Sequence, residues 1–205
     1  MIKRFLLLLL TTLPLAVNAQ WRIGATGGFT YNMYTSDKHY LTDLHNEGHW
    51  GGTFGLACQY DLKEWKWCHS RIGVRADANA ACKAIHTTKG HSATNLKADI
   101  TNYPLYIQLP IMANYSLGSN LFRAFLNIGS YGGWKIKGQE NEWQRRFDFG
   151  GVGGLGAELN IWRLTFQAEA RGYASAISAT KSDRKFKTPH YNTTLAFQVA
   201  LFYNF

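Results

Sequence analysis

Beyond its first 19 residues, the chain has no apolar stretch as long as the roughly 20 residues that a membrane-spanning helix needs. The one apolar run extends from Phe5 to Val17, preceded by Lys3 and Arg4 and followed by the small residue Ala19. This order of positive charge, apolar core and small residue is typical of a secretory signal peptide. We therefore expect residues 1–19 to be cleaved off, which leaves an exported chain of residues 20–205. An uncleaved N-terminal anchor is the alternative for this segment.

Cysteine is scarce, and the three present are Cys58, Cys68 and Cys82. They form no CxxC pattern, and their odd number means that at least one lacks an internal disulfide partner. No cysteine directly follows the expected cleavage point, which argues against a lipid-anchored lipoprotein. We interpret all three as small apolar or turn residues, and the pattern leaves one disulfide open.

Acidic residues are few: 13 against 22 Lys and Arg, a net charge of +9. Without Lys3 and Arg4 the chain keeps a net charge of +7. A basic exported protein would meet nucleic acid only outside the cytosol, so we expect no nucleic acid partner. Lipid phosphates and acidic glycans are the partners that this charge favours.

A regular two-residue alternation is present at the end of the chain. The odd positions from Leu195 to Phe205 are all large and apolar, whereas most even positions from Ala196 to Asn204 are small or polar. Period two is the period of a β-strand, so the segment predicts a strand with two different faces.

The same alternation occurs in eight segments of the chain. Eight alternating strands in one small domain indicate a barrel or a sandwich. The segments lie at about residues 21–34, 50–61, 70–84, 102–117, 122–136, 147–160, 163–176 and 191–205.

The connections between these segments are alternately long and short. This layout is typical of outer-membrane barrels, which have tight periplasmic turns and longer external loops. We therefore predict that residues 20–205 form an all-β, eight-stranded, antiparallel, up-and-down transmembrane β-barrel in the bacterial outer membrane. Both termini would be periplasmic, and the external loops would be 35–49, 85–101, 137–146 and 177–190.

The two faces of the strands decide between a membrane barrel and a soluble one. One face carries bulky aromatic and aliphatic side chains with almost no charge, and the other carries Gly, Ala, Ser and Thr with occasional charges. An eight-stranded interior is just wide enough to be filled by side chains, so small residues suit the inside. A soluble, lipocalin-type barrel would reverse the faces and is the alternative.

Aromatic residues gather at both ends of the predicted strands. Membrane-spanning barrels carry such belts at the two membrane interfaces. The belt residues are Trp21, Tyr60, Tyr115, Trp162, Tyr203 and Phe205 near the short turns, with Trp50, Tyr103 and Trp134 near the long loops.

Three segments resemble a known family. YIQLPIMANY (106–115) is similar to the mid-barrel strand of the PorT-like outer-membrane β-barrel proteins of Bacteroidetes-type bacteria. FDFGGVGGLGAEL (147–159) and LNIGSYGGW (126–134) resemble two further strands of that family. The resemblance implies an outer-membrane location and an accessory role in protein secretion of the type IX kind. It also implies that barrel-assembly machinery reads the C-terminal strand, for which Phe205 is the expected aromatic signal.

A set of charged residues is expected to point into the barrel. One interpretation makes it a selectivity lining for transport, and the other an ion-paired plug, since unpaired buried charges cost several kcal/mol each. We favour the plug, with the inward glycines Gly55, Gly73 and Gly154 leaving room for long side chains. The predicted network is Arg75, Asp77, Glu158, Glu169 and Arg171, with Arg71, Lys83 and Arg123 nearer the strand ends.

Histidines concentrate in the long connections, where they could bind a transition metal if the loops converge. No two of them have a firm ligand spacing, so we predict no metal and no cofactor. The candidates are His39, His45, His49, His86 and His91, with His190 at the edge of the last loop.

Other chemistry is weakly supported. The glycines of IGATGGF and FGGVGGLGAE do not open a helix, which argues against a dinucleotide site. Acidic and histidine side chains at 37–49 could form an acid–base pair. No nucleophile motif accompanies them, so we predict that the protein is not an enzyme.

Pro104 and Pro110 both fall on the inward face of the fourth segment. Proline lacks the N–H that strand pairing needs, and a closed barrel has no free edge. We therefore predict a bulge or a local loss of pairing at these residues.

These patterns together predict an integral outer-membrane protein with a structural or interaction role. Its expected partners are outer-membrane lipid and lipopolysaccharide, the barrel-assembly machinery, and other envelope proteins that would bind the external loops. A type IX-like secretion accessory, or a barrel that binds a small ligand or metal through its loops, are the alternatives.

Overall fold

The structure is a computed structural model that describes residues 20–36, 49–65, 69–83, 85–90, 97–102, 104–137, 146–177 and 190–205. The expected signal peptide, residues 1–19, lies outside the described residues. Within these ranges, the structure contains no helix long and apolar enough to cross a membrane.

Ten β-strands make up the described chain. Eight of them follow the predicted segments to within a few residues at each end. The strands are β1 (Gln20–Ser36), β2 (His49–Trp65), β3 (Ser70–Cys82), β4 (Ile85–Gly90), β5 (Lys97–Asn102), β6 (Leu105–Gly118), β7 (Phe122–Lys137), β8 (Phe147–Ile161), β9 (Leu164–Ser175) and β10 (His190–Asn204).

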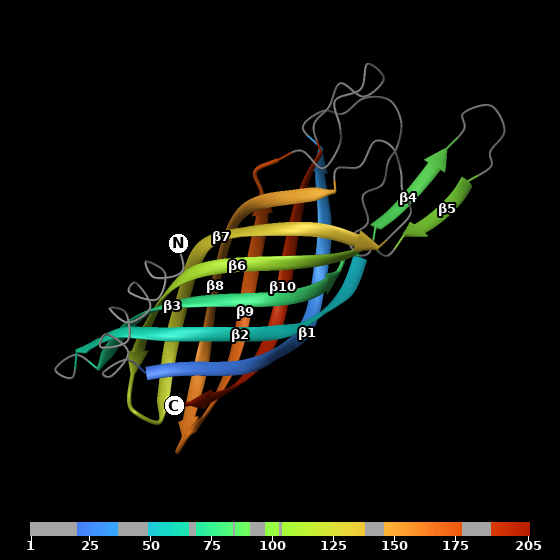
Figure 1. Cartoon of the computed structure of the whole chain (residues 1–205). Coiled ribbons are helices and arrows are strands. Elements are labelled where there is room, and N and C mark those ends of the chain that lie inside the picture. Colours follow the sequence, from blue (N-terminus) through green and yellow to red (C-terminus); the bar gives the residue numbers. More distant parts are fainter. Residues whose placement is uncertain are drawn as a thin grey trace, which may run out of the picture.

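Eight strands close into one antiparallel barrel in the order β1-β10-β9-β8-β7-β6-β3-β2 (Figure 1). Closure is made by β1, which pairs with β2 on one side and with β10 on the other. Every pairing is antiparallel, and the strands joined by the short connections are neighbours in the sheet. The predicted eight-stranded, up-and-down barrel is confirmed.

The two remaining strands were not predicted. Residues 85–101 were expected to form a loop, and 102 was expected to begin the fourth barrel strand. Instead, β4 and β5 pair with each other from Ile85↔Asn102 to Gly90↔Lys97, and the barrel strand β6 begins at Leu105. This hairpin projects from the barrel at the end opposite the C-terminus (Figure 1).

Burial alternates along the barrel strands as the sequence predicts. In β6, Ile107, Leu109 and Ile111 are about half exposed on the outside, whereas Gln108 and Met112 are buried inside. The outer face is thus apolar, and the polar side chains fill the lumen. Because a barrel exterior of this composition would be unfavourable in water, it is suited to lipid.

The prolines interrupt pairing as predicted. Register between β3 and β6 runs from Ser70↔Leu117 to Ala76↔Ile111 and resumes only at Asn79↔Gln108, so Pro110 and Leu109 have no partner on β3. On the other side, β6 keeps its pairing with β7 at Pro110↔Tyr131. Beside Pro104, the β6–β7 register shifts between Leu105 and Tyr106. The missing N–H of Pro110 accounts for the gap beside β3. It is different at Pro104, which precedes β6 and whose carbonyl accepts from the Lys83 N–H, so its missing N–H does not explain the shift on the β7 side.

Candidate functional site: the polar interior

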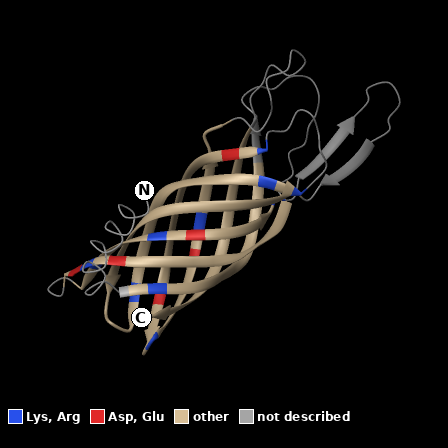
Figure 2. Cartoon of the chain, viewed as in Figure 1, with Lys and Arg blue, Asp and Glu red and all other residues tan. Residues whose placement is uncertain are grey.

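Charged side chains occupy the barrel interior at three heights, each beside side chains of opposite sign. Figure 2 shows the positions of charged residues along the strands, at several levels between the two ends of the barrel. Their inward direction follows from strand alternation, because each lies on the same face as the small and amide residues of its strand. The three heights are the short-turn end, the middle of the barrel and the long-loop end.

The middle cluster contains Arg75 and Asp77 from β3, with Glu169 and Arg171 from β9. Asp77 binds both arginines: Oδ1 lies 2.8 Å from Arg75 Nε, and Oδ2 lies 2.7 Å from Arg171 Nη1. Glu169 Oε2 lies 3.1 Å from Arg75 Nη1 and 2.7 Å from Arg171 Nη2. The four side chains are 0 to 2 % exposed. Two positive and two negative charges therefore neutralise each other across the lumen.

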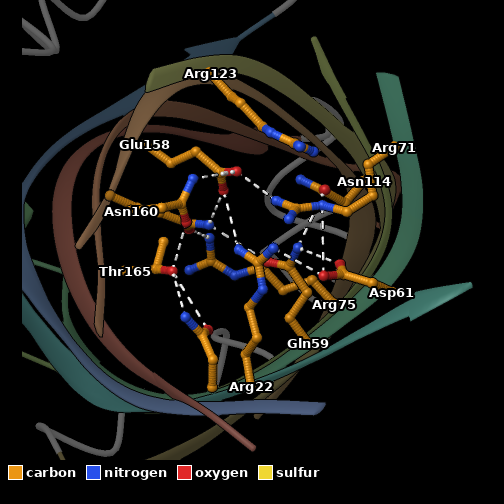
Figure 3. Close-up of polar contacts among 12 residues, drawn as sticks. Arg22, Gln59, Asp61, Arg71, Arg75, Asn114, Arg123, Glu158, Asn160 and Thr165 are labelled. Atoms are coloured by element: carbon orange, nitrogen blue, oxygen red, sulfur yellow. Dashed lines mark hydrogen bonds and ion pairs between the residues drawn. The ribbon is translucent and has the colours of Figure 1, made fainter. Parts of the chain in front are cut away.

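The cluster at the short-turn end joins Arg22 of β1, Asp61 of β2, Arg71 of β3 and Glu158 of β8 (Figure 3). Arg22 Nη2 lies 2.8 Å from Asp61 Oδ2, and its Nη1 lies 3.2 Å from Glu158 Oε2. Arg71 contacts the same two carboxylates, through Nε at 3.4 Å from Asp61 Oδ2 and through Nη2 on Glu158 Oε1. These two arginines and two carboxylates form a square of alternating charges, so this cluster is likewise neutral.

The third cluster lies toward the long-loop end. Lys83 Nζ is 2.9 Å from Asp148 Oδ2, and Tyr131 and Ser175 donate hydrogen bonds to the same carboxylate at 3.2 and 2.7 Å. The Lys83 ammonium also lies 5.0 Å from the centre of the Tyr106 ring. Lys83 is fully buried, so its charge is held by one carboxylate and the aromatic faces.

Amide side chains connect the middle cluster to the one below it. Gln167 donates to Glu158 at 3.1 Å and accepts from Arg75 at 2.8 Å. Asn127 donates to Glu169 at 2.8 Å and accepts from Asn114 at 2.8 Å. These amides add a second donor to carboxylate oxygens that Arg22 and Arg171 also contact, and so tie the two clusters into one network.

All five residues of the predicted charge network thus lie inside and take part in ion pairs, four in the middle cluster and Glu158 in the short-turn cluster. Arg22, Asp61 and Asp148 are buried members of these clusters that the predicted network does not include. Their contacts join strands that are distant in the sequence, so pairing depends on barrel register and side-chain length, which alternation alone does not specify.

The inward glycines leave room for polar side chains as predicted. At Gly55 and Gly73 they also allow a close approach of the neighbouring backbone, because an added Cβ would lie 2.2 Å from the Ala78 carbonyl oxygen and 2.7 Å from that of Tyr60, respectively. A Cβ added at Gly154 would lie 2.3 Å from Glu169 Oε1, and one at Gly55 would lie 2.4 Å from Asn79 Oδ1. At Gly73 the same atom would lie 3.1 Å from Asp61 Oδ1. Each distance is shorter than an ordinary van der Waals contact, so these glycines let long polar side chains lie flat against the wall.

The aromatic residues pack in pairs at both ends of the barrel. Trp21 and Tyr60 have ring centres 4.7 Å apart, and Tyr203 and Phe205 have theirs 5.2 Å apart. Trp134 at the other end packs against Phe147. Trp50, at the same long-loop end, packs against Tyr31. Near the short turns, Tyr115 is half exposed on β6. Trp162 forms the two-residue β8–β9 turn with Arg163. Tyr103 lies outside the described residues.

The predicted histidine set is not brought together in the described part of the chain. His39, His45 and His91 lie outside it, together with Asp37, Asp43 and Glu47. His49 begins β2 and is partly buried, whereas His86 lies in β4 and His190 begins β10. Among the described residues, no group of three or more His, Cys, Asp or Glu side chains could hold a metal ion. Cys58 and Cys82 are free thiols, and Cys68 lies outside the described ranges.

Comparison with known proteins gives a family but no close relative. No curated protein matches the chain. Solved structures that are similar include the attachment invasion locus protein Ail of Yersinia pestis, at 12 % identity and a TM-score of 0.41, with 90 % of this chain and 98 % of that one covered. Neisserial surface protein A has 10 % identity and a TM-score of 0.47, with 90 % and 97 % covered. Outer membrane protein W of E. coli has 15 % identity and a TM-score of 0.38, with 87 % and 97 % covered.

Residues 17–180 match the family described as the outer membrane protein beta-barrel domain. This match covers most of the closed barrel, from β1 through β9. The chain therefore belongs to the outer membrane protein beta-barrel domain family, and the protein is an outer-membrane β-barrel.

Proposed function

We propose that this protein is a closed outer-membrane barrel with a structural or interaction role, whose long-loop end is its binding surface. The observation that carries the proposal is the middle charge cluster. Arg75, Arg171 and Asp77 lie across the lumen with side chains 0 to 1 % exposed, and each charge is paired. A plug of this kind leaves no water-filled path through the barrel at the level of the middle cluster.

Apolar side chains support the same interpretation on both sides of the cluster. Phe202 lies below the Arg75 guanidinium, whose carbon is 5.3 Å from the ring centre. Met112, Tyr131 and Tyr173 form a buried group with Val152 and Ala196. Eight-stranded barrels have an interior that side chains can fill, whereas porins that leave a channel have 16 to 18 strands.

The binding surface would be the end from which the β4–β5 hairpin projects (Figure 1). The hairpin is joined to the barrel at its base, where the Lys83 N–H donates to the Pro104 carbonyl at 3.0 Å. A paired hairpin offers a partner a more ordered surface than a flexible loop, which lowers the entropy cost of binding. In this proposal the long-loop end faces the outside of the cell, and both chain termini face the periplasm.

Single-channel recording in planar lipid bilayers tests the closed barrel. We expect the purified protein to give no conductance steps. The double variant E169S/R171S removes one charge of each sign and shortens two side chains, so it should introduce brief openings. Stable, ion-selective steps from the unmodified protein would show that the charges line a pore, and the transport interpretation would replace ours.

A PorT-like role in secretion is a narrower prediction, and family membership supports only the barrel part of it. If it holds, deletion of the gene should leave exported cargo proteins in the periplasm. Normal cargo secretion by the deletion strain would rule it out. Binding of a small ligand or metal by the loops instead predicts saturable binding that is lost when those loops are removed.

A further inference from the structure

The mouth of the barrel at the short-turn end contains a basic cavity that the proposed function does not use. It has a volume of about 600 Å³. Among the described residues that line it are four arginines and a single acid, Glu64. The arginines are Arg22, Arg71, Arg123 and Arg163. They come from β1, β3, β7 and the β8–β9 turn, so the cavity is built by strands from around the whole barrel.

Three of these arginines are ion-paired with acidic side chains, and Arg163 is not. Arg22 and Arg71 share Asp61 and Glu158 in the neutral square at the floor of the cavity. Arg123 is ion-paired with the partly exposed Glu64 through Nη2 and donates from Nε to the Ser119 carbonyl at 3.1 Å, so Nη1 is its free donor group within the described chain. Arg163 donates to the Tyr203 hydroxyl at 2.9 Å and lies over the Trp162 ring. Neither contact neutralises the Arg163 charge.

Three buried donor groups at this end make no hydrogen bond within the described chain: Arg71 Nε, Ser116 Oγ and Arg123 Nη1. Of these, Arg71 Nε keeps an ion-pair contact with Asp61 Oδ2 at 3.4 Å. Their residues lie on the adjacent strands β3, β6 and β7, where Arg71 pairs with Ser116 and Arg123 with Gly118. Figure 3 shows the guanidinium groups of Arg71 and Arg123 pointing into the lumen. Arg123 is 3 % exposed. Because buried donors are nearly always satisfied, the unpartnered Ser116 Oγ and Arg123 Nη1 indicate a missing acceptor.

One acceptor also lacks a hydrogen bond there, Asp61 Oδ2, although it lies within ion-pair distance of Arg22 and Arg71. A water molecule could satisfy Asp61 and Ser116. Water would not neutralise Arg163, whereas an anion would, and the anion would also give Arg123 Nη1 an acceptor.

We propose that this cavity binds a phosphate group, held by Arg123 and Arg163 with Arg71 beneath them. Guanidinium groups bind phosphate oxygens in pairs of hydrogen bonds, and a phosphate offers oxygens to several donors at once. Asn120, Asn160 and Asn204 also line the cavity and add amide donors. A carboxylate has only two oxygens and would leave more of these donors unpaired. Tyr203 and Phe205 lie at the rim, where the acyl part of a lipid could rest, so the phosphate could be free or part of a lipid headgroup.

Calorimetric titration of the full chain, in a non-ionic detergent without phosphate, tests the site. The probes are inorganic phosphate, a short-chain phosphatidylglycerol below its critical micelle concentration, the matching diacylglycerol, and acetate. We expect saturable binding of inorganic phosphate, of the phosphatidylglycerol, or of both, and none of the diacylglycerol. Saturation by phosphate would indicate a free anion, and saturation by the lipid alone a headgroup. Acetate that binds as tightly as phosphate, or no saturable binding of either phosphate probe, would overturn the proposal.

Arg123→Gln removes the central charge and keeps the side chain's approximate size. It should weaken phosphate binding about tenfold or more, as expected for loss of a charge-assisted, paired contact. Lys63→Gln is the matched control, because Lys63 is exposed at the same end, lies against Trp65, and does not line the cavity. It should change binding by less than about twofold, the size of a screened surface charge. Equal weakening by the two variants would mean that net charge alone attracts the anion and would overturn the site.

Arg163→Gln covers the case in which Arg123→Gln fails to fold. Arg163 lies in an exposed two-residue turn, so its loss leaves the barrel core intact. We expect this variant to fold and to weaken phosphate binding by about three- to tenfold, since its contact is less buried. Unchanged affinity in this variant would contradict the proposed position of the phosphate.

Discussion

Each buried arginine in this barrel is paired with particular carboxylates. The stability of the fold depends on all of these partners being present. Arg171 is in ion-pair contact with Asp77 and Glu169, and it donates to the Tyr173 hydroxyl at 3.1 Å. Removing one member of a buried pair leaves the other charge without compensation, whereas removing both members costs far less. At the scale of single residues, the interior is therefore a set of mutually dependent charges.

Arg171→Leu should lower the free energy of unfolding by about 3 kcal/mol, because it leaves the middle cluster with an excess negative charge. The double variant R171L/E169L restores neutrality with the Arg75–Asp77 pair, which lies at 2.8 Å. It should recover much of that loss. Urea unfolding in lipid vesicles, followed by tryptophan fluorescence, measures both. The single variant Glu169→Leu completes the comparison. If the losses of unfolding free energy in the two single variants add up to the loss in the double variant, these two charges do not depend on each other.

Gly154 and Gly151 form a matched pair on β8. A Cβ at Gly154 would meet Glu169, which Arg171 and Asn127 hold in place, while a Cβ at Gly151 would meet nothing within 4 Å. Gly154→Ala should cost about 1 to 3 kcal/mol of unfolding free energy through overpacking. Gly151→Ala should change it by no more than about 0.5 kcal/mol. The same urea titration compares them, and equal effects would mean that Gly154 has no role in making room for Glu169.

At the scale of strands, Pro110 explains a gap in an otherwise continuous sheet. Its missing N–H faces β3, where Asp77 and Ala78 have no partner in the β6 register. The neighbouring pairs Ala76↔Ile111 and Asn79↔Gln108 enclose the gap, so only a short part of the seam is open.

Pro110→Ala should let residue 110 donate to β3 and add about 1 kcal/mol of stability, the usual net value of one hydrogen bond. Amide hydrogen exchange by solution NMR in detergent measures the change directly. The new backbone amide at position 110 should exchange as slowly as its neighbours in β6. Fast exchange at this position together with unchanged stability would mean that the proline is not the cause of the gap.

The β4–β5 hairpin should be dispensable for folding. It pairs with itself in a separate two-stranded sheet, and the backbone bond from Lys83 to Pro104 lies between it and the barrel. Replacing residues 85–102 with a short Gly-Ser link should therefore leave the barrel able to fold. Gel mobility with and without boiling is the measurement, and a heat-dependent shift like that of the full chain is the expected result. A variant with no folded band would show that the hairpin is part of the barrel's folding unit.

The barrel strands could be predicted from sequence because each has one face in contact with lipid and one with the lumen, which imposes a strong period of two. The hairpin could not, because HTTKG (86–90) has no apolar face and the alternation of ADIT (98–101) lasts only four residues. Strand pairing there is also local. Inward charged residues could be named from the same period. Their partners could not, since Arg22 meets Glu158 across 136 positions of the chain, a contact that only barrel closure creates.

At the scale of the whole molecule, the two faces of the sheet contact two different media. The outward faces are lined by half-exposed Leu, Ile, Val and Phe side chains, which lipid can solvate without cost. The lumen holds charges that neutralise each other at three heights, with amides that connect two of the clusters. Family membership and the closed topology place the barrel in the outer membrane, and its packed interior supports our proposal that it does not conduct.

Spin-label accessibility along β10 tests this arrangement most directly. Labels would be attached singly to residues 195–201 of the unfolded chain, with the native cysteines replaced, before folding into lipid vesicles. At odd positions such as Phe197 and Val199, collisions with oxygen should exceed collisions with a water-soluble nickel chelate, because these side chains face lipid. At even positions such as Gln198 and Ala200, collisions with both should be rare, because the lumen is packed. Frequent collisions with the nickel chelate at the odd positions would mean that the outer face is in water. Frequent collisions with it at the even positions would mean that the lumen is an open channel. Either result would contradict the closed, lipid-embedded barrel.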